Sequence, residues 1–328
     1  MTRRVCFFAN VSRRDHLERA EFYAQDLKIL REIGFDVRVA TSPRELVVAD
    51  LYFCWWWTWA FIPATLAQLL GRPLVVTGVF DLKEFDTRGP VQRALMRYAL
   101  RAASGNVFLS AMEQTQVKRR FDVSRSHYIP MGVETRLYQP NGSVREDMIL
   151  SVAWLQAGNA ERKGLPESIL ATQLLQRRRP SVRLLVAGEK ASGYPRLRDL
   201  VASLGASDYV TFLGAIPKNE KIGLMQRCKV YVQPSQFEGF GVAILEAMSC
   251  GAAVLTRPVG AVPEVVGDAA FLVEEPGVEA LEAGLLELFE NDRLRTALGQ
   301  RARARAETEF PYERRKRELA ELIDGILR

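Results

Sequence analysis

The sequence predicts an α/β protein made of two successive doubly wound domains, each a parallel sheet covered by helices on both faces. Short runs of β-branched and apolar residues alternate with longer amphipathic stretches along almost the whole chain. Such an alternation produces βαβ units, and these units build parallel sheets. The alternation pauses once, at a cluster of turn residues spanning 138–143, and then starts again. A chain of 328 residues can supply a separate core for each half.

In the first half, six short apolar runs predict strands, and the amphipathic stretches between them predict helices. Phe22, Leu27, Leu30 and Ile33 recur with the helical period, and Gly34 suits the end of that helix. The predicted strands are 5–9, 36–40, 51–54, 74–77, 106–109 and 127–129, and the predicted helices include 17–33, 90–103 and 111–121.

The second half repeats the pattern. From Val278 the sequence is helical to its end, with an interruption at Phe310 and Pro311. We therefore predict domains at 1–139 and 140–309, followed by a helix at 310–328. Ligands of doubly wound domains bind beyond the carboxyl ends of the strands, so a cleft between the two domains is the expected site. The predicted strands of this half are 148–152, 183–187, 209–213, 230–233, 253–255 and 270–273.

Composition excludes several classes of protein. The four cysteines are scattered and only two histidines occur, so no local spacing assembles a metal site, and buried free thiols are expected. The apolar run at 5–9 is too short for a signal peptide, and no stretch reaches the length of a membrane span. These features predict a cytoplasmic protein. The net charge of +6 suits phosphorylated ligands, an anionic membrane surface or nucleic acid without choosing among them.

Familiar nucleotide motifs are missing. The first predicted strand leads into Asn10-Val11-Ser12 rather than a G-x-G-x-x-G turn, and no P-loop occurs. There is no D-x-D pair to clamp a metal-bound nucleotide sugar. No basic recognition helix or RNA-binding aromatic motif is present, so nucleic acid is not an expected partner.

The segment most indicative of chemistry joins a strand, a glycine turn and a helix. Glu238 lies in the turn, and Glu246 lies on the helix that begins near Gly241. Gly239 and Gly241 permit a positive φ and a close approach of ligand to backbone, while the amide groups of the helix start suit phosphate or sugar oxygens. Glu246 lies about 7–8 Å along the helix, so the two carboxylates suit the two ends of an extended polyhydroxylated ligand. The alternative is a glutamate at the helix N-terminus together with an unrelated surface glutamate.

At these residues the sequence resembles glycosyltransferases of the GT-B fold, within the large retaining family 4. The resemblance covers nearly the whole second half. It is carried by Pro234-Ser235 with Glu238-Gly239-Phe240-Gly241 and Glu246, by the segment 260–266, by Phe212-Leu213-Gly214 and by 127–133. The family's G-G-x-P-E segment has Ala261 in place of its second glycine. The resemblance implies two Rossmann-like domains, an interdomain cleft and a C-terminal helix that packs back on the first domain.

The resemblance also implies roles for the donor side. Glu238 would hold hydroxyls of the donor sugar, and Glu246 would bind the ribose. The backbone at 239–241 would contact sugar and phosphates, and Lys163 would stabilise the leaving diphosphate without a metal or other cofactor. The remaining residues assigned to the donor nucleotide are Ser235, Gly214 and Leu245.

Three departures from the family pattern affect the phosphate and acceptor sides. Trp154 replaces an arginine, and either Arg162 supplies the second positive charge or it is a surface residue. The loop 10–14 replaces a glycine-rich turn, so Arg13 is either an anion contact or a solvated charge. Phe80 replaces a histidine that often lies near the acceptor, which leaves Asp81 either to orient the acceptor hydroxyl or to cap a helix.

The acceptor is expected to be a glycan or a lipid-linked molecule. Trp57, within a tryptophan cluster that follows a strand, is the candidate sugar platform, with burial in the core as the alternative. Arg93, Arg97 and Arg101 recur every four residues on an amphipathic helix, which indicates either peripheral contact with an anionic membrane or an ordinary solvated face.

Three functions follow from these residues. The first is retaining transfer from a UDP- or GDP-sugar to a hydroxyl. The second is epimerisation or hydrolysis of a nucleotide sugar in the same fold. The third is non-catalytic binding, which the departures make conceivable and the set of Glu238, Glu246 and Lys163 argues against.

Overall fold

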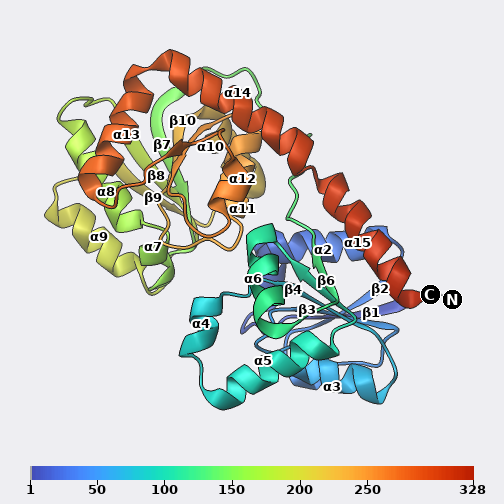
Figure 1. The fold of residues 1–328 in the computed structure, drawn as a ribbon. Helices are drawn as coiled ribbons and strands as arrows, with labels where there is room; N and C mark the ends of the chain where they lie inside the picture. Colours follow the sequence, from blue (N-terminus) through green and yellow to red (C-terminus); the bar gives the residue numbers. More distant parts are fainter. Residues whose placement is uncertain (1) are drawn as a thin grey trace. The chain divides into compact units, whose positions relative to one another are not determined.

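The computed structural model describes residues 2–328 and divides the chain into two compact units (Figure 1). The first unit contains the described residues up to Gly132 together with Tyr312–Arg328, and the second contains Val133–Pro311. The predicted boundaries, after residues 139 and 309, differ from these. Residues 133–139 go with the second unit because Val133 pairs with Pro311 and donates its N–H to the Phe310 carbonyl at 2.8 Å.

The first unit has a six-stranded sheet that is parallel throughout, in the order β2-β1-β3-β4-β5-β6. All six predicted strands are confirmed to within a few residues. β3 and β4 are buried along their whole length, which explains why they read as continuous apolar runs. The strands are β1 (Arg4–Phe8), β2 (Asp36–Ala40), β3 (Leu51–Trp55), β4 (Leu74–Gly78), β5 (Gly105–Phe108) and β6 (Ser126–Tyr128).

Helices cover both faces of this sheet. α3 and α5 pack on one face, and α2 lies on the other (Figure 1). The single helix predicted at 17–33 is two helices, because Ala20 is extended at φ −82° and ψ 109°. The helices are α1 (His16–Arg19), α2 (Glu21–Glu32), the 3-10 turn η1 (Pro43–Glu45), α3 (Phe61–Leu69), α4 (Leu82–Thr87), α5 (Pro90–Ala102), α6 (Ala111–Phe121) and α15 (Tyr312–Leu327).

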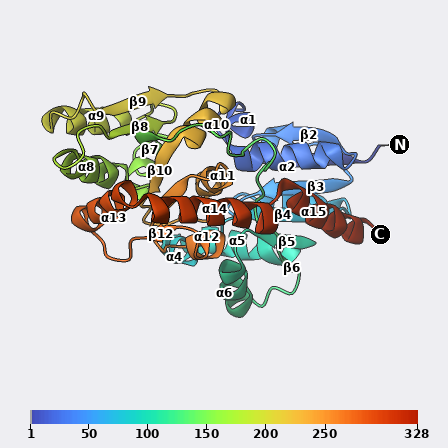
Figure 2. The same cartoon turned by 90° about the horizontal axis from the view of Figure 1, so that it is seen from above.

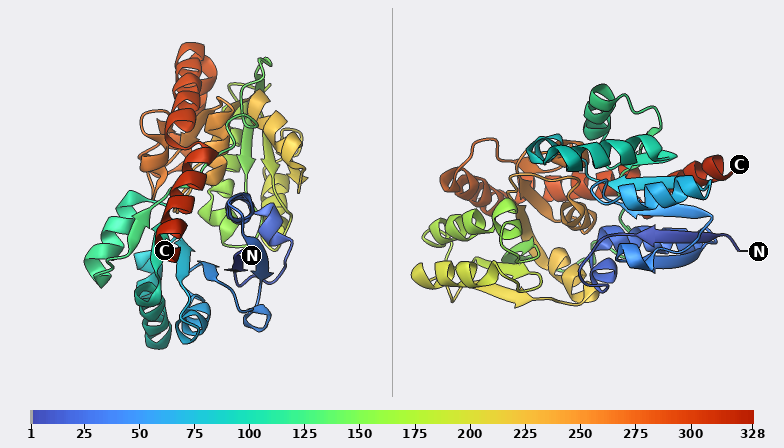
Figure 3. Two further views of the ribbon diagram at one scale, coloured as in Figure 1. Left: turned by 90° about the vertical axis from the view of Figure 1, so that its right-hand side faces the viewer. Right: turned by 90° about the horizontal axis from the view of Figure 1, so that it is seen from below.

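The C-terminal helix α15 packs on the first unit (Figure 3). Its Arg315 is fully buried and forms a two-point ion pair with Asp26 of α2, at 2.7 and 2.8 Å. Arg315 also donates to the carbonyl groups of Ile129 and Pro130. A charge buried this deeply is tolerated because every part of the guanidinium has a partner.

The second unit repeats the architecture with a parallel sheet in the order β12-β11-β10-β7-β8-β9 (Figure 2). Its six predicted strands are also confirmed. The strands are β7 (Glu146–Val152), β8 (Arg183–Ala187), β9 (Val210–Gly214), β10 (Cys228–Gln233), β11 (Ala253–Thr256) and β12 (Phe271–Leu272). The helices are α7 (Asn159–Arg162), α8 (Leu165–Gln176), α9 (Tyr194–Ser203), α10 (Lys218–Arg227), α11 (Val242–Ser249), α12 (Val262–Val266), α13 (Val278–Glu290) and α14 (Asp292–Glu309).

The strand order of the second unit reverses between β7 and β10. The chain runs from β7 outward through β8 and β9, then returns to β10 and continues outward on the other side. Loops that follow two strands at such a reversal diverge, and the space between them is where doubly wound domains bind ligands. The loops at this point are those that follow β7 and β10, and they carry Lys163 and Glu238.

Candidate functional site

Two loops of the second unit are joined closely at the reversal point. The N–H of Gln236 donates to the Arg162 carbonyl at 2.8 Å, and the Arg162 guanidinium donates to the Phe237 carbonyl at 2.6 Å. Gly164 has φ +70°, and a Cβ there would lie 2.5 Å from the Pro234 carbonyl oxygen. A glycine is therefore needed for the loop after β7 to approach the loop after β10.

Glu238 is held by three donors through one carboxylate oxygen. Its Oε1 accepts from Lys163 Nζ at 2.6 Å, Ser235 Oγ at 2.7 Å and Gln233 Nε2 at 2.8 Å. Only 4% of the residue is exposed. The other oxygen, Oε2, makes no hydrogen bond to any described residue. The carboxylate is thus fixed on one side and has an acceptor available on the other.

Charge keeps Glu238 ionised despite its burial. Burial raises its pKa, but Lys163 and Arg162 outweigh that effect, so the pKa of Glu238 lies below its usual value. Burial lowers the pKa of Lys163, although Glu238 opposes the shift. The site therefore contains a carboxylate and an ammonium group 2.6 Å apart and largely removed from solvent.

A hydrogen-bonded chain reaches Glu238 from inside the sheet. Tyr231 donates its hydroxyl to Gln233 Oε1 at 2.7 Å, and the Gln233 amide then donates to Glu238. Burial raises the pKa of Tyr231 well above its usual value, so the phenol stays protonated and donates. Sequence reasoning missed both residues. The feature of the sequence that could have identified them is a pair of polar residues two positions apart on β10. This spacing places both side chains on the same face of the sheet.

The main chain of Glu238 is fixed by the loop after β11. The N–H of Ala261 donates to the Glu238 carbonyl at 2.9 Å. A Cβ on Gly260, at φ +54°, would lie 2.0 Å from that carbonyl oxygen. The segment 260–266 therefore acts by positioning Glu238, and Gly260 is the residue that allows the contact.

The glycine turn leads into α11 with a left-handed residue. Gly241 has φ +93° at the N-cap, which favours glycine over other residues. Phe240, in the same turn, is 4% exposed and packs edge-on against Phe310 at a centroid distance of 5.7 Å. The side chain of Phe240 is thus structural, and only the backbone at 239–241 remains to contact a ligand.

Glu246 repeats the arrangement seen at Glu238. Its Oε1 accepts from Tyr138 Oη and from Lys221 Nζ, each at 2.6 Å, and its Oε2 makes no hydrogen bond to the described residues. Only 2% of the residue is exposed. Tyr138 and Lys221 were not singled out from the sequence, because neither the linker tyrosine nor a helix lysine carries a local motif.

Two residues predicted for the donor site have fully buried side chains. Leu245 is fully buried on α11 and its side chain belongs to the core, so any contact of this residue with a donor stays a prediction. Ser235 is also fully buried, and its hydroxyl is used to hold Glu238. Both side chains help to hold the site in place.

Arg162 is held in place by hydrogen bonds from both of its terminal nitrogens. One terminal nitrogen donates to Phe237 and lies 3.6 Å from Glu238 Oε1, and the other donates to Asn159 Oδ1 at 2.8 Å. Asn159 in turn donates to the Trp154 carbonyl at 2.6 Å. Arg162 therefore adds positive charge beside Glu238 while keeping the loop in shape. Trp154 is 41% exposed.

Gly214 ends β9 on the opposite side of β7 from Glu238. It has φ +77°, and its carbonyl accepts from Gly188 N–H at 2.8 Å. The nearest atom that a Cβ there would meet belongs to Lys190, at 3.9 Å, so the backbone at Gly214 is open to approach.

In the first unit, the prediction for Trp57 as a sugar platform is wrong. Trp57 is 1% exposed, stacks on Phe108 and donates its indole N–H to Asn106 Oδ1 at 2.8 Å. The side chain lies in the core, where it packs against Phe80 and Phe108. Its neighbour Trp56 is half-buried instead, donates to Tyr23 Oη at 2.5 Å, and has φ +75°.

Several features at the ends of β3 and β4 lower the stability of the folded protein. A bulky residue at positive φ is strained, and Trp56 is accommodated because its ring packs against Gly78. The adjacent Trp55 and Thr77 are partners in register, and Trp55 Nε1 and Thr77 Oγ1 are both buried without a hydrogen-bond partner among the described residues. Such orphaned groups cost stability.

The other two first-unit candidates have structural partners. Asp81 caps α4 by accepting the Lys83 N–H at 2.8 Å, and Arg13 forms an ion pair with Asp15 at 2.6 Å. Both residues lie in loops that follow strands β4 and β1 at the carboxyl edge of the sheet.

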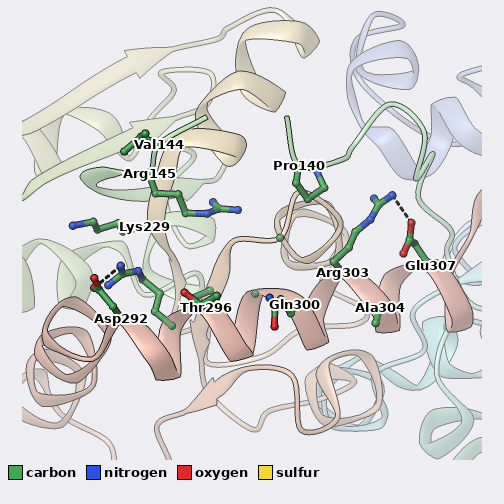
Figure 4. Close-up of a pocket in the computed structure, with 14 residues that line it drawn as sticks. Pro140, Val144, Arg145, Lys229, Asp292, Thr296, Gln300, Arg303, Ala304 and Glu307 are labelled. Atoms are coloured by element: carbon green, nitrogen blue, oxygen red, sulfur yellow. Dashed lines mark hydrogen bonds and ion pairs between the residues drawn. The ribbon is translucent and has the colours of Figure 1, made fainter. Parts of the chain in front are cut away.

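A groove of about 730 Å³ lies elsewhere in the second unit, between α14 and the starts of β7, β10 and β11 (Figure 4). Its cations already have partners. Arg145 donates to the Met225, Cys228 and Cys250 carbonyls, Arg303 donates to backbone at Thr135 and Tyr138, and Lys229 pairs with Asp147. The groove lies at the edge opposite Glu238, and its arginines hold neighbouring loops.

No group of three or more histidine, cysteine or acidic side chains among residues 2–328 is arranged to hold a metal ion. The four cysteines are buried free thiols, as predicted. In the same described part of the chain, no helix has both the length and the apolar character required to cross a bilayer.

The comparisons with known proteins agree with this architecture. The sucrose-phosphate synthase of Thermosynechococcus elongatus superposes with a TM-score of 0.82 over 99% of both chains at 18% identity. The chain has the GT-B fold. Anabaena HepE, solved with UDP and glucose, superposes with a TM-score of 0.77 over 98% of this chain and 100% of that chain at 20% identity.

Sequence comparison finds a family match within the second unit. Residues 145–305, which carry Glu238, Glu246 and Lys163, match the family described as Glycosyl transferases group 1. The MMP alpha-(1->4)-mannosyltransferase of Mycolicibacterium hassiacum is 30% identical over 210 residues, which are 62% of this chain. The chain spans half the length of that relative. The matched family and the relatives are glycosyltransferases.

Proposed function

We propose that the chain is a retaining glycosyltransferase that moves a sugar from a nucleotide-sugar donor to an acceptor hydroxyl. The observation that carries the proposal is the cluster of Lys163, Ser235 and Gln233 around one oxygen of the buried Glu238. A fixed carboxylate with one accessible acceptor oxygen suits a sugar hydroxyl. Lys163 beside it suits the negative charge that develops on the leaving diphosphate.

In this proposal each part of the site has one role. The Oε2 of Glu238 accepts a hydroxyl of the donor sugar, and the backbone at 239–241 contacts sugar and phosphates. Lys163, with Arg162 beside it, neutralises the diphosphate, so transfer proceeds without a metal or other cofactor. Glu246 binds the ribose, and the base lies near Gly214. The acceptor oxygen bonds to the anomeric carbon on the face from which the diphosphate leaves, so the configuration is retained. The bond from that carbon to the diphosphate breaks, and a phosphate oxygen takes the acceptor proton.

The residues proposed to contact the acceptor belong to the first unit. We propose that Asp81 orients the acceptor hydroxyl and that Arg13 contacts an anionic part of the acceptor, which is a glycan or a lipid-linked molecule. Both residues lie at the carboxyl edge of the first-unit sheet, where doubly wound domains bind ligands.

The function is tested with a thermal-shift panel of UDP, GDP and their sugars, because a ligand that binds the native state raises its melting temperature. GDP-mannose and UDP-glucose head the panel, since one relative is a mannosyltransferase and one solved neighbour holds UDP and glucose. Turnover of the bound donor that requires an added acceptor supports transfer. Turnover without an acceptor would indicate a hydrolase or an epimerase, and binding without any turnover would indicate a non-catalytic protein.

Contact with a cytoplasmic membrane surface is a separate proposal. On α5, Arg97 stacks over Phe85 and Phe121, whereas Arg93 and Arg101 flank it on the same helix. We expect co-sedimentation with vesicles containing anionic lipid and none with neutral vesicles, and loss of binding when Arg93 and Arg101 become glutamine. The same change at two exposed arginines of α9, Arg196 and Arg198, is the control, and equal loss there would contradict a specific role for α5.

A further inference from the structure

The groove between α14 and the starts of β7, β10 and β11 is lined by more cationic than acidic side chains (Figure 4). Its lining residues all lie between Pro140 and Glu307, within the second unit. The volume of about 730 Å³ is in the range of pockets that hold small molecules. Among the described residues, the charged groups of the lining are Arg145, Lys229, Arg295, Arg303, Asp292 and Glu307.

Arg145 carries a charge that no carboxylate balances. Its guanidinium donates to the carbonyl groups of Met225, Cys228 and Cys250, and it forms no ion pair within residues 2–328. Burial lowers the pKa of Arg145, and the positive charge of Arg295 adds to that shift. An arginine stays charged in spite of such shifts. Its carbonyl contacts use three of the five N–H groups of a guanidinium, so donors remain for an anion.

The two other arginines of the groove are paired with carboxylates that are more exposed than the arginines themselves. The side chain of Arg295 is 11% exposed, whereas that of its partner Asp292 is 79% exposed. The side chain of Arg303 is 18% exposed, and that of its partner Glu307 is 47% exposed. Ion pairs with an exposed partner contribute little to stability, so an incoming anion can replace these carboxylates at a small cost.

We propose that this groove binds a phosphate monoester of a small polar molecule, with the phosphate against Arg145. The phosphate carries close to two negative charges, which meet the unbalanced guanidinium and the arginines beside it. Thr296 and Gln300 line the same groove from α14 and offer a hydroxyl and an amide to the rest of the ligand. The inference goes beyond the proposed function and does not depend on it, because Glu238 lies at the opposite edge of the sheet.

A phosphate suits the groove better than a carboxylate does. A single negative charge would balance Arg145 and gain nothing from the neighbouring arginines, which already have partners. A second negative charge attracts those arginines as well, and the planar guanidinium matches the geometry of phosphate oxygens.

A phosphate monoester reaches a protein either as a soluble compound or as the headgroup of a lipid, and two probes separate these sources. The first is glucose 6-phosphate, titrated into the full chain by calorimetry at an ionic strength of about 0.15 M. The second is co-sedimentation with phosphatidylcholine vesicles that contain phosphatidic acid.

The deciding variant is Gln300→Glu, which adds a negative charge to the groove and keeps the size of the side chain. Gln300 is exposed on α14, so the change leaves the core untouched. Gln116→Glu is the matched control. Gln116 is exposed on α6, close in sequence to the cations at 118–120, and undergoes the same change in charge.

We expect Gln300→Glu to bind glucose 6-phosphate about fivefold or more weakly than the parent, and Gln116→Glu to bind it as the parent does. Charges further apart than about 8 Å are largely screened at this ionic strength, so an anion bound beside Lys163 would respond to neither change. Vesicle binding that Gln300→Glu alone weakens, without binding of glucose 6-phosphate, would identify the lipid as the source. If Gln300→Glu weakens neither probe, or neither probe binds the parent, the inference is wrong and the proposed function stands.

A second pair of variants tests the cation. Arg145→Met is compared with Arg305→Met, because Arg305 also donates its guanidinium to backbone carbonyls, those of Glu264 and Val265, and lies outside the groove. Arg145→Met should bind the probe about tenfold or more weakly, and Arg305→Met should bind it as the parent does. Unchanged binding by Arg145→Met would overturn the inference. If Arg145→Met does not fold, the comparison of Gln300→Glu with Gln116→Glu still decides.

Discussion

Lys163 and Glu238 form a nearly buried ion pair, with Nζ 2.6 Å from Oε1, that joins the loop after β7 to the loop after β10. The pair lies where the strand order of the second unit reverses. It therefore links the geometry of the fold to the charges of the proposed donor site. Variants that remove one or both charges can show how much the pair contributes to stability and how much to activity.

Removal of the ammonium leaves a buried carboxylate without its main partner. Lys163→Met should lower the free energy of unfolding by about 3–5 kcal/mol, measured by urea denaturation. Transfer should fall by about 100-fold or more, because the charge on the leaving diphosphate is no longer stabilised. The double variant Lys163→Met with Glu238→Gln should recover most of the stability and none of the activity. Recovery of activity in the double variant would contradict a direct role for either residue.

The lowered pKa values predict how the site responds to pH. Glu238 has a folded pKa below its unfolded value, so its stabilising contribution is present above the unfolded value and is lost as pH falls through the folded one. For Lys163 the folded pKa is also lowered, so at this group the unfolded chain binds more protons between the two values, and the contribution of Lys163 to stability rises with pH there. Activity should instead fall in that alkaline range, because Lys163 loses its charge below the pKa of an ordinary lysine. The four buried cysteines have raised pKa values and lower stability over the same alkaline range, so the effect of Lys163 is measured as the difference between the parent and Lys163→Met. This difference in unfolding free energy should grow with pH while the initial rate of the parent falls.

The backbone of Glu238 depends on the missing side chain at Gly260. Gly260→Ala places a Cβ 2.0 Å from the Glu238 carbonyl oxygen and should displace the carboxylate, with donor binding reduced about tenfold or more. Gly142→Ala is the matched control, because Gly142 also has a positive φ, +76°, and nothing lies within 4 Å of its Cβ position. The control should cost about 1 kcal/mol of stability and leave donor binding unchanged. Equal losses in the two variants would mean that backbone strain alone is responsible.

The orphaned hydroxyl of Thr77 costs stability. Thr77→Val keeps the shape of the side chain and removes a buried group that has no hydrogen-bond partner, so the free energy of unfolding should rise by about 1 kcal/mol. Thr172 is equally buried but donates to the Ser168 carbonyl at 2.7 Å, so Thr172→Val should lower it instead. A fall in both variants, measured by thermal and urea unfolding, would show that Thr77 has a partner such as a bound water.

Much of the fold could be predicted from the sequence, because fully buried parallel strands give continuous apolar runs of about the right length. β3 and β4 were found this way. The split of the helix at 17–33 could not be found, because Ala20 is a good helix former and only tertiary packing makes it extended. The boundary at 132 was also hidden, since it is set by the pairing of Val133 with Pro311, residues far apart in the chain.

The same limit applies to the site. Glu238, Glu246 and Lys163 were found because they lie in local motifs, and the structure places Lys163 directly on Glu238. Gln233, Tyr138 and Lys221 could not be assigned, since their contacts with the two carboxylates depend on packing between elements. Trp57 was misread because the sequence indicates that tryptophans follow β3 without indicating which of them points inward.

The burial of Arg315 against Asp26 has a consequence for how the protein is made. The last helix of the first unit follows the entire second unit in the sequence, so a ribosome synthesises the second unit before Asp26 can meet its partner. Until then the carboxylate of Asp26, which is buried in the folded protein, has no counterion, and the N-terminal part cannot complete its own folding. The second unit, which is continuous along the chain, has all of its residues earlier. The order of synthesis therefore favours completion of the second unit first, with the N-terminal part waiting for α15.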